Sequence, residues 1–328
     1  MNNQTEIHQQ IRDRLSKSRR PMIVSHMRPD GDAVGSLIGM GLALKRSGKE
    51  PTLILEDGIL SKFRFLVGSE MITKNAGEGN DLIIALDCSD RNRMGETFSK
   101  LNFDINIDHH ITNDNFGDIN LVRPDYAATA SILAESLPKW GLPLDADSSS
   151  ALLMGILTDT IGFRTSNVTP SLLRQVAILM ENGANLSLLY TNTLVSISFP
   201  SSLIWGFSLS RLVKEDRLVW TSITLEDRKK AHYCGSDDAD LTNVLSAIEE
   251  SDVSIVFNEQ NDGKVKVSWR SNEPYNVSKV AQLFGGGGHP PASGAEIEGT
   301  LEDVQVAVLI KTKQYMKELS STGDPKNG

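Results

Sequence analysis

The chain has 328 residues and a formal net charge of −9 at pH 7, because 42 Asp and Glu residues outnumber 33 Lys and Arg residues. This length predicts two domains, and the acidic charge argues against a protein that binds long nucleic acid, since such binding requires clustered basic side chains. No apolar stretch approaches the roughly 20 residues of a bilayer span and the first residues are polar, so we expect a cytoplasmic protein without a membrane partner.

Short apolar runs alternate with helical patterns through the first third of the chain. The spacing of apolar residues predicts a helix over 5–19, a short buried strand over 21–26 and a buried helix over 33–48. Three further apolar runs end in acidic residues and are predicted to be strands: 51–56, 81–87 and 103–108. Such runs are typical of parallel strands covered by helices, so we expect an α/β fold with a mainly parallel sheet flanked by helices.

The remainder of the chain divides into two parts. Apolar residues follow helical spacing in the first part, whereas apolar and polar residues alternate in the second part, as in β-strands. Three helices are predicted in the helical part: 128–141, 148–163 and 169–183. Pro200 and several serines then interrupt the pattern, which indicates a domain boundary. Three strands and a helix are predicted beyond it: 216–224, 253–259, 264–271 and 276–284.

These patterns define the expected domain organisation. A strong hairpin turn, Asn-Asp-Gly at 261–263, joins the last two predicted strands. We expect a first domain, a linker, a smaller C-terminal α/β domain and a disordered tail, with these bounds: 1–193, 194–204, 205–319 and 320–328.

A histidine and two carboxylates lie close together just after the first predicted strand. His26 ends this strand, and Asp30 and Asp32 follow in a tight turn, so that each carboxylate could serve one of two adjacent metal ions. A structural interpretation competes with this one, because Asp-Gly is a common turn and Asp a common helix N-cap. A second cluster of His and Asp at another strand end favours the metal site.

Acidic and imidazole side chains also end two later strands. Asp87 closes one, and Asp108-His109-His110 follows the other. Ligands of open parallel sheets lie beyond the carboxyl ends of the strands, where these side chains would meet. Asp87 could instead cap a helix and the histidines could lie in a surface loop, yet adjacent histidines after an apolar run are costly to bury without partners. One imidazole could bind a metal while its neighbour donates a hydrogen bond to a substrate.

Three further features are candidates for the same site. Asp159 lies between apolar segments and would be a costly buried charge unless it were paired, bound to metal or used as an N-cap. The run Gly285–Gly288 before His289 would let backbone N–H groups approach an anion, although flexible glycine linkers have the same composition. Arg270, at the end of a predicted strand, could bind phosphate or lie in solvent.

Together these motifs resemble the DHH phosphoesterase superfamily over nearly the whole chain. Asp108-His109-His110 is the naming triplet, HMRPDGDAVGS resembles the first motif, LDCSD the second and GILTDTIGF the fourth. The segment 276–294, NVSKVAQLFGGGGHPPASG, resembles the substrate-binding segment of the DHH-associated second domain. Length and motif order are most similar to the bifunctional oligoribonucleases, or nanoRNases, that also dephosphorylate pAp.

The resemblance implies the fold and the residues of the active site. It implies an N-terminal DHH domain, a C-terminal DHH-associated domain and an active site in the cleft between them. Two divalent metal ions, with Mn²⁺ preferred and Mg²⁺ or Co²⁺ as alternatives, would be held by six side chains: His26, Asp30, Asp32, Asp87, His109 and Asp159. Asp87 would bridge the ions and His110 would contact the scissile phosphate. The nucleotide would be bound by residues of the second domain: Arg270, Ser271, Asn276, Gly287, Gly288 and His289.

The implied activity is hydrolysis of short RNA or DNA oligonucleotides to mononucleotides, and of pAp to AMP and phosphate. A phosphodiesterase for cyclic di-AMP or pApA is the alternative within the same superfamily. A family II pyrophosphatase would lack the glycine segment, and a catalytically inactive nucleotide-binding regulator would have lost a metal ligand, whereas all six positions are filled in this chain. The resemblance leaves a homodimer open.

Overall fold

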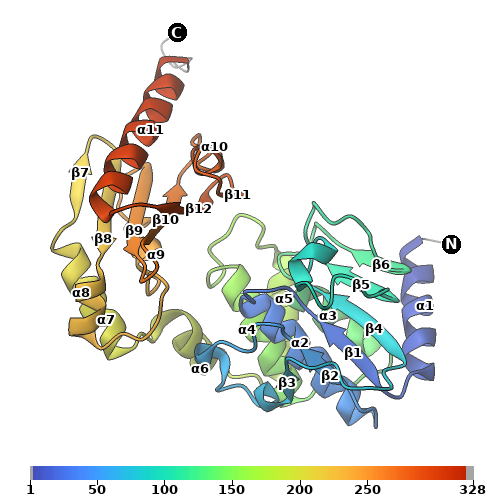
Figure 1. Ribbon diagram of the computed structural model, residues 1–328. Helices are drawn as coiled ribbons and strands as arrows, with labels where there is room; N and C mark the ends of the chain where they lie inside the picture. Colours follow the sequence, from blue (N-terminus) through green and yellow to red (C-terminus); the bar gives the residue numbers. More distant parts are fainter. Residues whose placement is uncertain (1–2, 323–328) are drawn as a thin grey trace. The chain divides into compact units, whose positions relative to one another are not determined.

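The computed structural model describes residues 3–322. Two compact units, Met1–Ser196 and Ile197–Gly328, make up the chain (Figure 1). The division between them falls inside the predicted linker 194–204, while the domain bounds themselves stay predictions. The last helix extends to Thr322, three residues into the predicted tail, and residues 323–328 of that tail lie outside the described ones.

The first unit is built on a sheet of six parallel strands in the spatial order β3-β2-β1-β4-β5-β6. The strands are β1 Pro21–Val24, β2 Thr52–Ile54, β3 Ile72–Thr73, β4 Leu82–Leu86, β5 Ile105–Asp108 and β6 Ile119–Val122. The order changes direction between β1 and β4, since β2 and β3 extend the sheet on one side and β5 and β6 on the other (Figure 1). A binding crevice is expected at such a point, outside the carboxyl ends of the strands.

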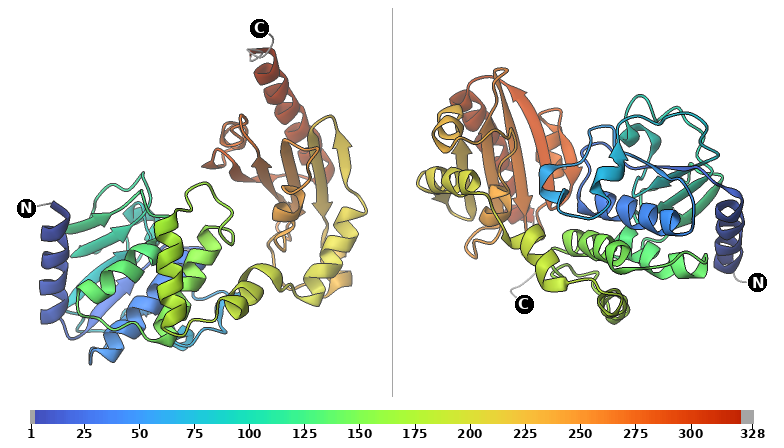
Figure 2. Two further views of the ribbon diagram at one scale, coloured as in Figure 1. Left: turned by 180° about the vertical axis from the view of Figure 1, so that it is seen from behind. Right: turned by 90° about the horizontal axis from the view of Figure 1, so that it is seen from below.

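Helices cover one face of this sheet, and loops with one short 3₁₀ turn, Arg91–Met94, cover the other (Figure 2). Because strand side chains alternate, Ile23 and Ile84 pack with the helices, whereas Met22 and Ala85 pack with Met94 on the opposite face. The helices are α1 Asn3–Lys17, α2 Gly31–Arg46, α3 Thr129–Lys139, α4 Ala146–Asp159, α5 Pro170–Glu181 and α6 Leu186–Tyr190. The short turns are η1 Ser61–Phe63, η2 Ser69–Met71, η3 Arg91–Met94 and η4 Thr191–Val195, the last of them a π-turn.

Side-chain caps and glycines set the positions of α2 and α4. The Asp30 carboxylate accepts hydrogen bonds from the backbone N–H groups of Asp32 and Ala33, at 3.0 and 3.1 Å, and so begins α2. Where α2 crosses α4, a Cβ at Gly35 would lie 2.5 Å from the Ala151 oxygen. The two backbones are therefore in direct contact, which only glycine permits.

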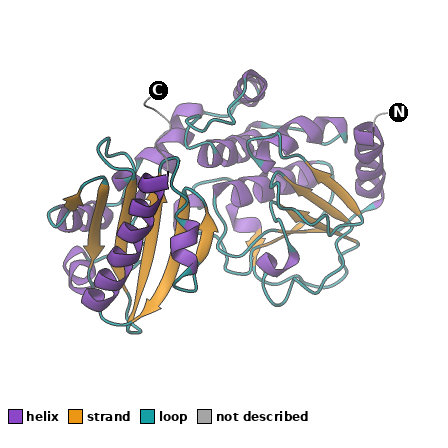
Figure 3. Ribbon diagram, turned by 90° about the horizontal axis from the view of Figure 1, so that it is seen from above, coloured by secondary structure: helices purple, strands orange, loops and turns teal. Residues whose placement is uncertain are grey.

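The second unit contains a sheet of six strands in the order β11-β12-β10-β9-β8-β7 (Figure 3). The strands are β7 Val213–Glu215, β8 Leu218–Ile223, β9 Val253–Glu259, β10 Lys264–Ser271, β11 Gly287–His289 and β12 Ala292–Glu298. Pairing is antiparallel except between β8 and β9. The predicted hairpin between β9 and β10 is confirmed, and Gly263 supplies the positive φ of 75° that its turn requires.

Helices pack on both faces of the second sheet. Trp269 and Phe257 contribute to the core beneath α10 and α11, whereas Val256 faces α7, α8 and α9. The bounds are α7 Phe199–Leu209, α8 Leu225–Ala231, α9 Leu241–Leu245, α10 Ser278–Gln282 and α11 Leu301–Thr322. The predicted α/β fold class, with a parallel sheet in the first unit, is confirmed. Within residues 3–322, none of the helices has the length and apolar character of a bilayer span.

Several elements differ from the sequence-based expectation, and β3, β7, β12, α7, α8, α9 and α11 have no predicted counterpart. The helix predicted over 148–163 ends earlier, at Asp159, because Ile161, Gly162 and Phe163 adopt left-handed backbone conformations with φ of 47°, 67° and 68°. Strand β6 was not predicted, since its four residues include Asn120 and show only a weak alternation of apolar and polar side chains. No strand was predicted in the glycine run, but part of it pairs as β11 with β12.

The contact between α2 and α4 yields a stability prediction. We expect Gly35→Ala to lower the free energy of unfolding of the first unit by about 1–3 kcal/mol, because the added methyl group meets the backbone of Ala151 and Gly155. Gly206→Ala is the matched control, since Gly206 is an exposed helical glycine with open space around it and should gain about 0.5–1 kcal/mol. Equilibrium urea unfolding measures both, and equal effects of the two substitutions would contradict this packing.

Candidate metal centre

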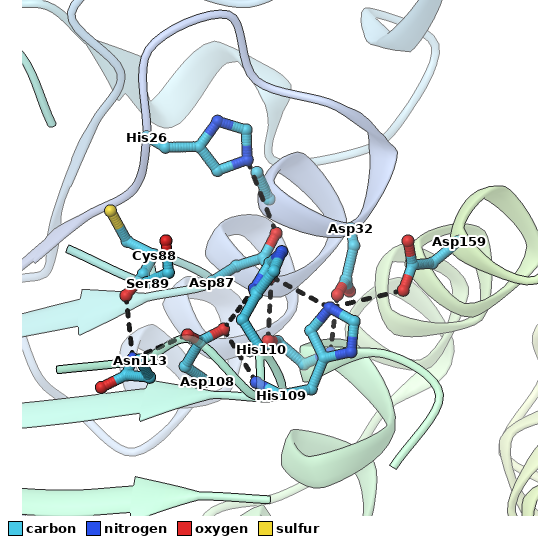
Figure 4. Close-up of polar contacts among 12 residues, drawn as sticks. His26, Asp32, Asp87, Cys88, Ser89, Asp108, His109, His110, Asn113 and Asp159 are labelled. Atoms are coloured by element: carbon cyan, nitrogen blue, oxygen red, sulfur yellow. Dashed lines mark hydrogen bonds and ion pairs between the residues drawn. The ribbon is translucent and has the colours of Figure 1, made fainter. Parts of the chain in front are cut away.

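Polar side chains lie at the carboxyl ends of three neighbouring strands of the first sheet. His26 follows β1 after one intervening residue, Asp87 follows β4 directly, and Asp108 is the last residue of β5. These strands are adjacent in the order β1-β4-β5, so their carboxyl ends lie side by side. The side chains predicted to meet at this edge do meet there (Figure 4).

Asp87 occupies the middle of the group and has an unusual backbone. Its φ of 54° is left-handed, a conformation that Asp and Asn tolerate better than most residues. The residue is 1% exposed. A buried, left-handed, non-glycine residue is strained, and such residues cluster at functional sites.

The two carboxylate oxygens of Asp87 face different partners. One, Oδ2, lies 3.7 Å from Nε2 of His26. The other, Oδ1, lies 3.7 Å from Nε2 of His109 and accepts a hydrogen bond of 3.0 Å from the Thr129 hydroxyl. One carboxylate therefore belongs to two sets of ligand atoms (Figure 4).

The structure gathers the six predicted metal ligands into two groups, and a further cluster of possible ligand atoms links Asp87 to the DHH triplet 108–110. In the first group, ligand atoms of His26, Asp30 and Asp87 all lie within 4.8 Å of one another. The second group has the same spacing and contains Asp32, His109 and Asp159, with 3.5 Å between Nε2 of His109 and Oδ2 of Asp159. Two donors about 2.0–2.2 Å from one cation lie roughly 3–3.5 Å apart, so small rotations of these side chains would suffice for coordination.

Asp32 is held by backbone donors at the start of α3. Its two oxygens accept from the N–H groups of Thr129 and Ala130 at 2.6 and 2.8 Å. The Ser36 hydroxyl lies 3.3 Å from Oδ1. Because Asp32 is 1% exposed, these bonds fix a buried carboxylate against Asp87 and Asp159.

The two ligand groups together contain more negative charge than their own histidines can neutralise. Burial and the charges of Asp87 and Asp159 raise the pKa of Asp32 well above its usual range. Burial raises the pKa of Asp159 to about 7, with His109 opposing the increase and Asp87 adding to it. Burial also acts to raise the pKa of Asp87, but His26 and His109 hold it below its usual range. Imidazole and carboxylate donors around uncompensated negative charge fit a divalent cation of the transition series.

His110 is oriented by Asp108 rather than by the metal ligands. Its Nδ1 lies 2.7 Å from Oδ1 of Asp108, which is fully buried, and 3.8 Å from Oδ1 of Asp87. Burial lowers the pKa of His110, but the hydrogen bond to Asp108 and the charge of Asp87 outweigh it and raise the pKa to about 9. A protonated, partly exposed imidazole beside the metal ligands can donate to a phosphoryl oxygen.

The predicted nucleotide-binding residues lie in the second unit. Arg270 and Ser271 end β10. Burial lowers the pKa of Arg270, and within the described part of the chain its guanidinium donates to the backbone oxygen of Trp269 at 3.1 Å. The Asn276 side chain accepts from the hydroxyl of Ser278, at 2.5 Å. A half-buried guanidinium without a carboxylate acceptor is available to an anion.

The glycines near His289 have separate structural reasons. A Cβ at Gly288 would lie 2.6 Å from the Ala292 oxygen, and its φ of 135° also requires glycine. Gly287 has open space where a Cβ would lie. A ligand can therefore approach the backbone at Gly287, whereas Gly288 is needed for pairing with β12.

Two residues that hold the centre together were not predicted from the sequence. Thr129 contacts both Asp32 and Asp87. Asn113 donates to Asp108. The sequence does contain one signal for Thr129. Two small residues, Ala127 and Ala128, precede it, and small residues permit another segment to approach the backbone closely at the start of α3.

Two protein-family models match this chain. The model described as DHH family, N-terminal domain, matches residues 20–184, and the DHHA1 domain model matches residues 235–318. A Thermus thermophilus protein named bifunctional oligoribonuclease and PAP phosphatase NrnA is 33% identical over 304 residues, which are 92% of this chain and 90% of that protein. A Bacillus subtilis protein of the same name is 26% identical, covering 83% of this chain and 87% of that protein.

Solved structures share the fold. An exopolyphosphatase-related protein from Bacteroides fragilis superposes with a TM-score of 0.87 at 23% identity, covering 96% of both chains. RecJ from Thermus thermophilus, crystallised with Mn²⁺, superposes with a TM-score of 0.54 at 13% identity, covering 95% of this chain and 54% of RecJ. At these identities the likeness shows the architecture alone.

Excess negative charge in the centre yields a prediction for metal binding. We expect added Mn²⁺ at about 100 times its dissociation constant to raise the melting temperature by about 5–10 °C above that of chelator-treated protein, since binding to the folded state contributes about 2.7 kcal/mol. Asp159→Asn should raise the melting temperature of chelator-treated protein at pH 8, because it removes a partly buried negative charge beside Asp87, and should reduce the increase caused by Mn²⁺.

The control for this experiment is Asp114→Asn, which changes an exposed acid near the centre but outside the ligand groups. It should leave both melting temperatures unchanged. A metal response that survives in Asp159→Asn but is lost in Asp114→Asn would contradict these ligand groups.

Proposed function

Because this chain belongs to the DHH family, as the sequence resemblance had indicated, we propose that it uses two metal ions to hydrolyse short oligonucleotides to mononucleotides and pAp to AMP and phosphate. The chain is a metal-dependent phosphoesterase by its family and by its relatives, which are named oligoribonuclease and PAP phosphatase. Coverage of about nine-tenths of both chains in the Thermus thermophilus comparison supports transfer of the substrate class.

The observation that best supports the proposal is the orientation of Asp87. Its oxygens face His26 on one side and His109 on the other, both at 3.7 Å. A carboxylate shared in this way fits a bridge between two cations, and a two-metal site suits in-line displacement at phosphorus.

The ligands of the two cations follow from the two groups. We assign His26, Asp30 and Asp87 to one cation, and we assign the other to a set that shares Asp87: Asp32, Asp87, His109 and Asp159. Such cations, when bound, activate water and neutralise charge on the phosphoryl oxygens. Mixed imidazole and carboxylate donors suit Mn²⁺, our first choice, although geometry and availability decide between metals.

The protein's own side chains perform the remaining steps. His110, protonated and held by Asp108, donates a hydrogen bond to the phosphoryl oxygen on which negative charge develops during attack. Thr129 keeps the Asp87 carboxylate in place through its hydroxyl. Water is the nucleophile, so no side chain forms a covalent bond to phosphorus.

The second unit supplies contacts to the nucleotide. Arg270 would pair with a phosphate or lie over a base, because its guanidinium has no carboxylate acceptor among the described residues. The backbone at Gly287 is open to a ligand, and His289 on the same strand is exposed. Few basic contacts in a protein of net charge −9 favour short substrates over long strands.

The bridging role of Asp87 predicts the outcome of its substitution. We expect Asp87→Asn to lower Mn²⁺-dependent hydrolysis of a dinucleotide and of pAp by about a thousandfold or more, since it removes the carboxylate that faces both His26 and His109. Asparagine is preferred to alanine because it tolerates the left-handed backbone at this position. Steady-state assays of both substrates, with circular dichroism to verify folding, provide the measurement.

The same assay separates the alternatives. A dinucleotide, a longer RNA, pAp and cyclic di-AMP are compared under one condition with wild-type protein. Preference for the dinucleotide and pAp supports the proposal, whereas turnover of cyclic di-AMP alone would replace it. Undiminished activity of Asp87→Asn would contradict the bridging role.

Arg270 yields a prediction that separates binding from chemistry. We expect Arg270→Gln to raise KM for the dinucleotide about tenfold or more while kcat changes little, because the side chain holds a part of the substrate that does not react. Lys266→Gln is the control, since Lys266 lies on the same face of β10. A loss confined to kcat in Arg270→Gln, or equal effects of both substitutions, would count against the assigned role.

A further inference from the structure

A ladder of three asparagines leads from the interior of the first sheet to His110. Asn106 lies on β5 and is fully buried, Asn120 lies beside it on β6, and Asn113 lies in the loop between these strands. The Asn106 amide donates to Oδ1 of Asn113 at 2.9 Å and to Oδ1 of Asn120 at 3.4 Å. None of the three belongs to the metal groups.

Backbone groups fix the direction of every bond in this ladder. The N–H of Asn115 donates to Oδ1 of Asn113 at 2.7 Å, so the other amide atom of Asn113 must be its Nδ2 donor. The N–H of Gly117 donates in the same way to Oδ1 of Asn120 at 3.0 Å. Asn106 must therefore present its Nδ2 to both neighbours, and its own Oδ1 is left buried without a partner among the described residues. A buried oxygen without a partner is unfavourable, so some other requirement maintains this direction.

The donor of Asn113 points at Asp108. Its Nδ2 lies 2.7 Å from Oδ2 of Asp108 and 3.0 Å from the backbone oxygen of Cys88 (Figure 4). The other oxygen of Asp108 accepts from the backbone N–H of His109, at 2.8 Å. With fixed donors on both oxygens, Asp108 acts as an acceptor throughout.

The tautomer of His110 follows from this arrangement. An accepting Oδ1 of Asp108, 2.7 Å from Nδ1 of His110, requires the proton on Nδ1. Nε2 is then the nitrogen that can act on a substrate. The ring orientation of His110 depends on the rotamer of Asp108, which Asn113 holds from the opposite side.

We propose that Asn113 is a positioning residue that acts through Asp108 to orient His110. This inference rests on the proposed function, because the role of His110 does. Asn113 contacts neither a metal ligand nor a substrate directly in this arrangement, so its removal should leave metal binding and substrate binding largely intact and should affect the rate of the chemical step.

The test compares variants of two asparagines in the same ladder. We expect Asn113→Ala to lower kcat for dinucleotide hydrolysis by about ten- to a hundredfold, with KM changed less than about twofold and the Mn²⁺-induced rise in melting temperature retained. Asn113→Asp keeps the size of the side chain but places an acceptor against Asp108, so at pH 8 it should lower kcat at least as much. Asn120→Ala is the matched control, because Asn120 contacts Asn106 and not Asp108, and kcat should be close to that of the wild type.

A spectroscopic measurement tests the same inference without turnover. In protein bound to diamagnetic Mg²⁺, the Nδ1 proton of His110 should give a downfield proton resonance, absent in His110→Gln, that shifts upfield or broadens in Asn113→Ala but not in Asn120→Ala. If wild-type protein were inactive, the proposed function would fail, and this resonance would still decide the role of Asn113. An unchanged resonance in Asn113→Ala, full activity of Asn113→Asp, or equal losses in the Asn113 and Asn120 variants would each overturn the inference.

Discussion

The buried Asp87 carboxylate, with one oxygen toward His26 and the other toward His109, is the constraint on which the first unit depends. Asp32 and Asp159 add negative charge beside it, and backbone N–H groups and histidines neutralise only part of that charge, as the raised pKa values of both residues indicate. Buried charge is unfavourable unless it is paired, so this arrangement is expected only where cations complete it. The same uncompensated carboxylate charge therefore accounts for the geometry of the centre and for its expected affinity for cations.

Helix packing brings the two sides of the centre together. Asp32 lies at the start of α2 and Asp159 at the end of α4, and they meet because Gly35 and Gly155 let the helix backbones touch. A Cβ at Gly155 would lie 3.0 Å from an oxygen of Asp32. Asp87 adds a left-handed backbone with a φ of 54° at the end of β4, where its carboxylate contacts Thr129 at the start of α3. A compact site thus requires glycines at the helix contact and a strained backbone at Asp87.

Several side chains at the carboxyl edge of the first sheet could be predicted from the sequence because they end an apolar run. His26, Asp87 and Asp108 close short strands, and the geometry of parallel sheets brings such ends together. Thr129 and Asn113 could not be found in this way, since their roles depend on hydrogen bonds between segments that only the folded chain brings together. Pairing of the glycine run as β11 was missed for a similar reason, because backbone contact with β12 leaves no periodic signal.

Electron paramagnetic resonance of protein bound to Mn²⁺ tests the central claim most directly. If Asp87 bridges two ions, the spectrum at two equivalents of Mn²⁺ will show an exchange-coupled pair, and Asp87→Asn will not form that pair. Signals of isolated Mn²⁺ at every ratio in wild-type protein would contradict the bridge and, with it, a centre built around one shared carboxylate.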